Sequence, residues 1–242
     1  MKHKNHSLGT RKAWLLAVVV FTFINMSIIL PAAPALADDK QEASQLVGKA
    51  KFLMESFMSD PNLEAFRHLI KQAKAVFLVP ELLKGAFIVG ASGGNGLFLA
   101  ADPKTGVWNG PAFYTVGGAS FGLQIGGASS ETAILVMTER GISSFLSNSL
   151  KLGADAGVAA GPIGIGAAAA TANLSADLIS FSRSKGLYGG VSLDGSVVAV
   201  RDGLNAAFYG KKVTPTDILV HHEVKSEAAS ALIEEVAKAA KK

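Results

Sequence analysis

A glycine-dense block, residues 85–210, most constrains how this chain can fold. It holds 24 of the 26 glycines in the 242-residue chain and contains neither histidine nor cysteine. Glycine interleaved with Val, Ile, Leu and Phe favours tight turns and close backbone packing in a β-rich domain. The block therefore predicts a sheet, and its composition argues against hydrolytic or metal chemistry within it.

The first 37 residues have the layout of a secretory signal. Basic residues precede an almost unbroken apolar run at 13–30, and Ala35-Leu36-Ala37 offers small residues for cleavage. A retained membrane anchor is the alternative, because about 18 apolar residues lie near the lower limit for spanning a bilayer. We predict cleavage after Ala37 and an exported protein that is periplasmic, secreted or associated with the envelope.

The net charge of the chain comes from this leader. The whole chain has 23 Lys and Arg against 19 Asp and Glu, and the leader holds four of the basic residues and no acid, which leaves 19 of each. A balanced charge provides no basic surface for phosphates, so no nucleic-acid partner is expected. Cysteine is absent from the whole sequence, so no disulfide contributes to stability.

Composition divides the rest of the chain into one domain, 38–220, and a C-terminal helical tail, 221–242. The domain is predicted to be helical at 38–84 and β-rich at 85–210. Leu46, Leu53 and Phe57 belong to an apolar stripe at helical spacing, which indicates an amphipathic helix. That helix either lies in a membrane interface, with these three residues facing the membrane, or covers a sheet with a second helix.

Turn signals divide the glycine-dense block into short strands. Ser92–Gly96 is predicted to be a turn between two strands, and Asp102–Gly106 combines proline and glycine as tight turns do. Closely spaced strands with helices on either side predict an α+β fold. We expect a glycine-rich antiparallel β-sandwich or barrel-like sheet with N-terminal amphipathic helices and a C-terminal helix.

No catalytic, cofactor or metal site is predicted. The glycine run at 89–96 lacks the strand-to-helix layout of a dinucleotide-binding loop. His221 and His222 are adjacent, and adjacent side chains in a strand point to opposite faces, which favours a solvated pair over a metal site. We therefore expect a protein without a cofactor that is not an enzyme.

Several sequence runs follow one another in the order of a known domain. They include Lys-Gly-x-Phe, a Trp after a turn, Gly-Gly-x-x-Phe-Gly-x-Gln-Ile-Gly and Phe-Ser-x-Ser-Lys-Gly-Leu-Tyr-x-Gly. The matching positions are 84–96, Trp108, Pro111, 117–126 with Gln124, 152–156, 158–162, 181–195 and 208–210. Together they cover about 46–219, and they resemble the SYLF family of lipid-binding proteins.

The resemblance implies a β-rich domain that binds a lipid or membrane surface, phosphoinositides in eukaryotic members, and actin in some of them. An exported protein has no access to actin, so a lipid is the expected partner. Arg183 and Lys185, with Lys151 as a further candidate, are the expected contacts to a lipid headgroup. Many members carry a basic residue where this chain has Ile165, so we expect a preference for less anionic lipids.

A second interpretation stays open. The protein is then a structural or protein-interaction module of the envelope with no lipid ligand. In that case its glycine-rich strands pair at an exposed edge with a strand of the partner.

Overall fold

The structure is a computed structural model that describes residues 33–86, 89–121, 126–164, 176–184, 187–189, 193 and 195–241. Leu36–Lys242 form one compact unit. The α-helices are α2 (Ala33–Ser59), α3 (Glu64–Leu69), α4 (Glu139–Leu146), α5 (Asp202–Tyr209), α6 (Pro215–Leu219) and α7 (Ser230–Ala239). Short 3-10 helices of the described residues are η1 (Pro61–Leu63) and η3 (Glu227–Ala229).

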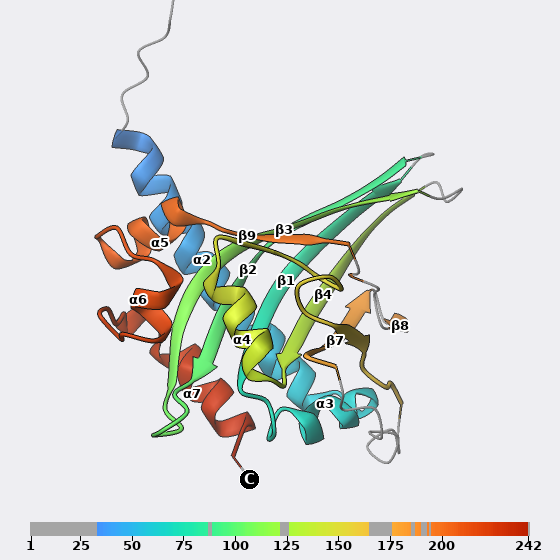
Figure 1. The fold of residues 1–242 in the computed structure, drawn as a ribbon. Helices are drawn as coiled ribbons and strands as arrows, with labels where there is room; N and C mark the ends of the chain where they lie inside the picture. Colours follow the sequence, from blue (N-terminus) through green and yellow to red (C-terminus); the bar gives the residue numbers. More distant parts are fainter. Residues whose placement is uncertain are drawn as a thin grey trace, which may run out of the picture. The chain divides into compact units, whose positions relative to one another are not determined.

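The strands form a single curled sheet (Figure 1). They are β1 (Ala75–Ala86), β2 (Val89–Ala101), β3 (Trp108–Phe121), β4 (Gly126–Val136), β5 (Ser149–Lys151), β6 (Val158–Ala160), β7 (Leu178–Ser184), β8 (Leu187–Gly189) and β9 (Val197–Val200). Their order is β5-β9-β3-β2-β1-β4-β7-β6, with β8 paired to β7. Neighbours are antiparallel except β6 and β7. The α+β class is confirmed, with the barrel-like sheet rather than a sandwich.

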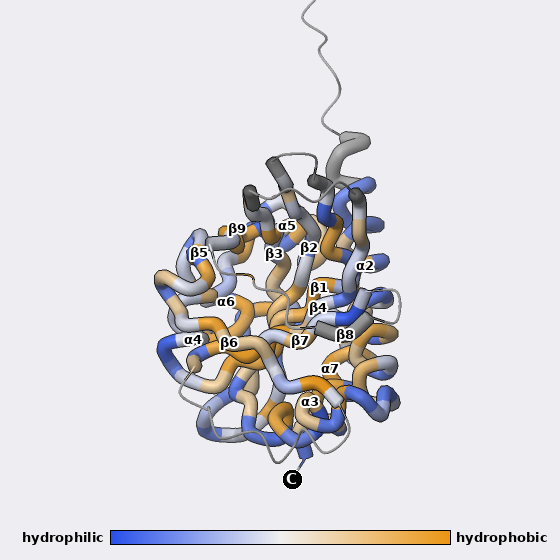
Figure 2. Tube along the Cα trace, turned by 90° about the vertical axis from the view of Figure 1, so that its right-hand side faces the viewer, coloured by the Kyte–Doolittle hydropathy of each residue, from blue (hydrophilic) through white to orange (hydrophobic). Residues whose placement is uncertain are grey.

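Helices cover both faces of the sheet, so the core has two parts (Figures 1 and 2). Residues of α2, α3, α5 and α7 pack on one face, and residues of α4 and α6 pack on the other. Alternate residues of each strand enter the two parts: Val76 and Leu78 of β1 pack beneath α2, whereas Phe77 packs toward α4. Period-two alternation of this kind is what a sheet buried on both faces requires.

The predicted N-terminal and C-terminal helices both belong to the core. The apolar stripe of α2 is buried from Ala43 to Phe57. In α7, Leu232, Val236 and Ala239 are buried in the same part of the core as that stripe. The C-terminal helix is therefore a packed element of the fold and not a loosely docked tail.

Strand β1 begins at Ala75, inside the segment predicted to be helical up to residue 84. The run Ala75–Val79 is apolar and buried throughout, and a short run of this kind has the same pattern in a buried helix and a buried strand. Pro80 lies within the strand, where the pairing with β2 shifts between Leu78 and Glu81. Proline has no N–H to donate, so a central strand tolerates it at a bulge.

Strand β2 runs straight through Ser92–Gly96, which were predicted to be a turn. A Cβ atom on Gly94 would lie 2.4 Å from the carbonyl oxygen of Glu81, and one on Gly96 would lie 2.6 Å from Cζ of Phe77. These glycines therefore serve close strand packing rather than a change of chain direction. The turn at Asp102–Gly106 is confirmed, since the Gly106 N–H donates to the Asp102 carbonyl at 2.8 Å.

A buried carboxylate joins α4, β7 and the loop before β6. Asp177 accepts hydrogen bonds from Arg140 at 3.0 Å, from the Thr138 hydroxyl at 2.6 Å and from the Gly157 N–H at 2.9 Å. The Arg140 guanidinium, followed by the Thr138 and Gly157 donors, holds the pKa of Asp177 well below its usual range despite burial. Because the pKa is depressed in the folded state, the charged carboxylate stabilises the fold above the unfolded-state pKa, about 3.9.

We expect the Asp177→Asn variant to be less stable than the parent by about 2 kcal/mol at neutral pH, because a charge-assisted network is lost. The difference should shrink as the pH falls below about 4, because the unfolded parent then takes up a proton at this carboxyl whereas the folded parent does not. Urea denaturation of both proteins between pH 7 and pH 3 measures it. A stability difference that stays constant over this range would contradict the assignment.

Candidate functional site

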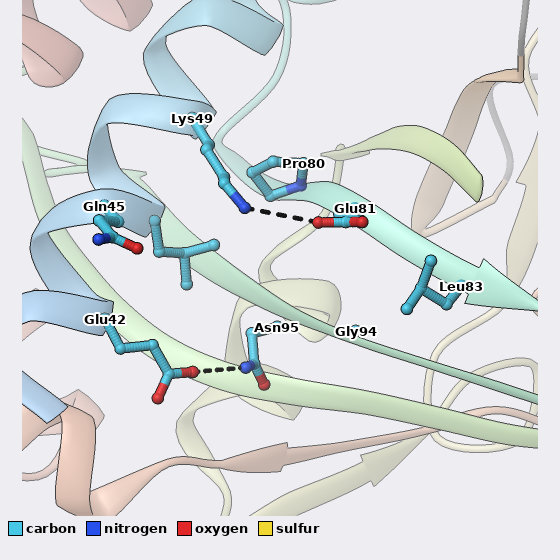
Figure 3. A pocket seen from close by; sticks show the side chains of 9 residues that line it. Glu42, Gln45, Lys49, Pro80, Glu81, Leu83, Gly94 and Asn95 are labelled. Carbon is cyan, nitrogen blue, oxygen red and sulfur yellow. Dashed lines mark hydrogen bonds and ion pairs between the residues drawn. The ribbon is translucent and has the colours of Figure 1, made fainter. Parts of the chain in front are cut away.

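A cleft lies between α2 and the strands β1 and β2 (Figure 3). Its volume is about 220 Å³. Its side chains come from one flank of the helix and from the facing strands: Glu42, Gln45, Leu46 and Lys49 from α2, Pro80, Glu81 and Leu83 from β1, and Asn95 from β2.

A second hollow of about 320 Å³ adjoins this cleft, because Lys49 and Glu81 line both. Phe52 from α2 and Glu131 from β4 belong to the second hollow. Phe52 is 70% exposed and Leu83 is 54% exposed, although both are large apolar side chains. We call the two hollows together the α2 cleft.

The local sequence explains why these side chains meet. Glu42, Gln45, Lys49 and Phe52 recur at intervals of three or four residues, so they share one flank of α2 beside its buried stripe. On the facing strand, the bulge at Pro80 changes the register of β1. Beyond that bulge, Glu81 and Leu83 both line the cleft under α2.

A polar network closes one end of the cleft. Glu42 accepts a hydrogen bond from the Asn95 side chain at 2.7 Å (Figure 3). Arg201, which follows β9, donates to the Asn95 side-chain oxygen at 3.1 Å and to Glu42 at 3.3 Å. These contacts connect α2, β2 and the residue that follows β9 at this end of the cleft.

An exposed ion pair spans the middle of the cleft. The ammonium of Lys49 lies 3.4 Å from a carboxylate oxygen of Glu81 (Figure 3). The two side chains are 59% and 52% exposed. Ion pairs this open contribute about 1 kcal/mol or less to stability, so this pair is free to exchange partners.

The three residues predicted to face a membrane are in the protein core. Leu46, Leu53 and Phe57 are at most 8% exposed and pack in the part of the core under α2. The sheet takes up the apolar stripe that would otherwise enter a bilayer, so the helix covers a sheet, as the alternative interpretation had it. Among the α2 side chains that the structure describes, the large apolar one that is exposed is Phe52, on the flank of the stripe.

Arg183, predicted to contact a lipid headgroup, joins β7 to β4 and to the end of α2. Its guanidinium donates to Glu131 at 2.5 Å, to Asp60 at 3.0 Å and to the Ser56 hydroxyl at 2.6 Å. Burial alone would lower the pKa of Arg183, but the hydrogen bonds with Glu131 and Asp60 raise it above its ordinary value. All these partners are protein groups, which indicates a structural role.

Of the other two predicted headgroup contacts, the structure describes Lys151 but not Lys185. Lys185 lies outside the described residues. Lys151 is exposed on β5, at the opposite end of the strand order from β7. Of the three predicted contacts, the described residues thus place Arg183 in an ion-pair network and Lys151 at an exposed position.

The α2 cleft escaped the sequence reasoning because its residues are far apart in the chain and unremarkable in type. One signal was available: Phe52 is an apolar residue outside the stripe of an amphipathic helix. Its partners from β1 depend on a bulge within a segment predicted to be helical, so no pattern indicated that Glu81 and Leu83 would face α2.

The described residues contain no group of three or more His, Asp or Glu side chains arranged to hold a metal ion. The ring of His222 contacts the Leu219 carbonyl at 3.1 Å. Among the helices of the described residues, none is both long and apolar enough to cross a membrane.

Comparison with known proteins places the chain in a family. Residues 117–239, from β3 to α7, match the family Ysc84, described as "Las17-binding protein actin regulator". The residues of α2, β1 and β2 that line the cleft lie before the matched range.

Relatives extend the similarity toward the N-terminus. The chain is 29% identical over 198 residues to LAS seventeen-binding protein 3 of Saccharomyces cerevisiae, covering 80% of this chain and 42% of the relative. It is 33% identical over 154 residues to human SH3 domain-containing YSC84-like protein 1, covering 63% of this chain and 44% of the relative. The chain thus spans less than half the length of these relatives. Because the family model matches half of the chain and these relatives extend the similarity, the chain belongs to the Ysc84, or SYLF, family.

Proposed function

We propose that this protein is an exported, non-enzymatic lipid- or membrane-binding protein of a bacterial cell envelope, and that it contacts lipid through the α2 cleft. The observation that supports this most is the exposure of Phe52 and Leu83 on either side of a cleft that also contains Lys49. Neighbouring apolar and basic side chains are the combination by which proteins bind membrane interfaces reversibly.

The size of this contact fits reversible binding. Burying one large apolar side chain contributes about 1.5–3 kcal/mol, and a cation near an anionic surface adds about 1 kcal/mol. Two apolar residues and one lysine therefore support a peripheral attachment that is readily released, not a permanent anchor.

Export rests on the N-terminal sequence, and the fold is compatible with it. The compact unit begins at Leu36, and the buried stripe of α2 begins at Ala43. Cleavage after Ala37 would therefore leave in place the buried stripe of α2 from Ala43 to Phe57. The mass of the protein recovered from the envelope or medium of expressing bacteria tests this: a chain that still contains the leader would contradict cleavage.

Co-sedimentation of the purified protein with phospholipid vesicles, at low and high salt, tests lipid binding. We expect a Phe52→Ala, Leu83→Ala double variant to bind at least tenfold more weakly, since it loses both apolar contacts. The matched control is a Val107→Ala, Val220→Ala double variant, which alters two other exposed apolar side chains. Equal binding by both variants would place any lipid contact elsewhere, and no binding by the parent would reject the proposal.

The alternative, a protein-interaction module without a lipid ligand, is supported by the relatives' names, since yeast LAS seventeen-binding protein 3 is named for binding another protein. A candidate edge for such a partner is the start of β4, because within the described residues β7 pairs with β4 at Glu131–Val136 alone. Organic extraction of the purified protein distinguishes the two functions: co-purifying lipid supports the first, and its absence together with no vesicle binding supports the second.

A further inference from the structure

The charges of the α2 cleft are arranged as ion pairs. Its acidic side chains are Glu42, Glu81 and Glu131. Each has a basic partner: Arg201 pairs with Glu42, Lys49 with Glu81, and Arg183 with Glu131. A cleft built in this way has no excess positive charge to attract a polyanionic headgroup.

Among the contacts of the described residues, the Lys49–Glu81 pair is the one of the three without a further hydrogen-bonding partner. The Glu42–Arg201 pair is tied to Asn95, and the Glu131–Arg183 pair is tied to Asp60 and Ser56. The Lys49–Glu81 pair is longer, at 3.4 Å, and both side chains are more than half exposed. A ligand can therefore separate Lys49 from Glu81 at little cost.

A ligand with both charges can replace this pair without leaving a charge uncompensated. A phosphate group takes the position of Glu81 beside Lys49, and an ammonium group takes the position of Lys49 beside Glu81. A purely anionic headgroup also gains the contact with Lys49, but it then faces the unpaired Glu81 carboxylate and is repelled. The exchange thus favours a zwitterion over an anion.

The surroundings of the pair suit the remaining parts of such a ligand. The Phe52 ring lies in the hollow beside Glu81, and the ammonium of Lys51 already lies 5.8 Å from its centroid. An aromatic face beside a carboxylate is a favourable environment for an alkylammonium group. Leu83, on the other side of Glu81, offers an apolar contact to the lipid body.

We propose that the α2 cleft binds the headgroup of a zwitterionic phospholipid in a membrane, with the phosphate at Lys49 and the ammonium at Glu81 beside Phe52. This inference rests on the proposed lipid-binding function. It adds which lipids the protein prefers and which residues determine that preference.

The Glu81→Gln variant tests this preference, with binding measured on phosphatidylcholine vesicles and on phosphatidylglycerol vesicles at low salt. We expect the parent to bind phosphatidylcholine more tightly. The variant should lose at least fivefold in affinity for phosphatidylcholine and gain affinity for phosphatidylglycerol, because Lys49 is then free for an anion. Glu55→Gln is the matched control, since Glu55 pairs with Lys51 on the same helix but lines neither hollow.

Other outcomes separate this inference from the proposed function. If the parent bound only phosphatidylglycerol, and Glu81→Gln changed vesicle binding no more than Glu55→Gln did, the zwitterion preference would be overturned. Lipid binding itself would stand. A parent that binds neither vesicle would reject lipid binding itself. Thermal unfolding of both variants should match that of the parent, because Glu81 is exposed and Glu55 is half-exposed in a pair with Lys51. A large loss of stability in Glu81→Gln would show a structural role instead.

Discussion

The Arg183→Ala variant should lose about 3 kcal/mol of its free energy of unfolding, because the change removes the largely buried guanidinium that bonds Glu131, Asp60 and Ser56. Arg183 is 20% exposed and Asp60 is 6% exposed, so little water can replace the lost contacts. For a domain of this size, such a loss lowers the melting temperature by roughly 6–12 °C. Urea denaturation and thermal unfolding measure the two quantities.

A matched control is Lys74→Ala, which removes an ion pair with Glu139 whose two side chains are 44% and 65% exposed. Its cost should stay within about 1 kcal/mol. Below its melting temperature, the Arg183→Ala variant should still bind phosphatidylcholine vesicles, because Phe52, Leu83 and the Lys49–Glu81 pair are unchanged. If binding fell while stability was preserved, Arg183 would be a headgroup contact after all.

Gly94→Ala should destabilise the protein by about 2 kcal/mol or more, whereas the same change at the neighbouring Gly93 should be nearly neutral. A Cβ atom on Gly94 would lie 2.4 Å from the backbone oxygen of Glu81, which cannot move without disturbing β1. On Gly93 the nearest atom would be the Val116 oxygen at 3.8 Å, an ordinary contact. The alanine also restricts the unfolded chain, which stabilises Gly93→Ala by up to about 1 kcal/mol.

The two alanine variants differ by one position in the same strand, so composition and strand propensity are matched. Urea denaturation midpoints of the two variants and the parent give the comparison. Equal destabilisation by both would show that glycine is needed for backbone freedom throughout this stretch rather than for close packing at Gly94. In that case the proximity of β2 to Glu81 would not explain why residue 94 is glycine.

Local patterns were sufficient for the outline of the fold. The apolar stripe of α2 and the turn at Asp102–Gly106 depend on residues close in sequence, and both are as predicted. The errors arose where long-range packing decides. The glycines of Ser92–Gly96 were interpreted as a turn. Their close packing against Phe77 and Glu81 arises only in the assembled sheet, so no local sequence pattern could indicate it.

The candidate site was less accessible to sequence reasoning than the fold. Arg183 was predicted to contact a lipid headgroup, but its partners Asp60 and Glu131 lie 123 and 52 residues away in the chain. In the same way, whether Lys49 meets Glu81 depends on a helix crossing a strand 32 residues later. Residue type can nominate a charged or apolar side chain, but its partners follow from tertiary structure.

The shared packing of α2 and α7 has a consequence for the order of synthesis. Both helices belong to one part of the core, so the apolar stripe of α2 is not fully covered until the ribosome has added the residues of α7. At about 5–20 residues per second, the intervening chain takes roughly 10–40 s to make. During that interval the apolar stripe of α2 is only partly covered, so the unfinished chain is open to misfolding until α7 has been added.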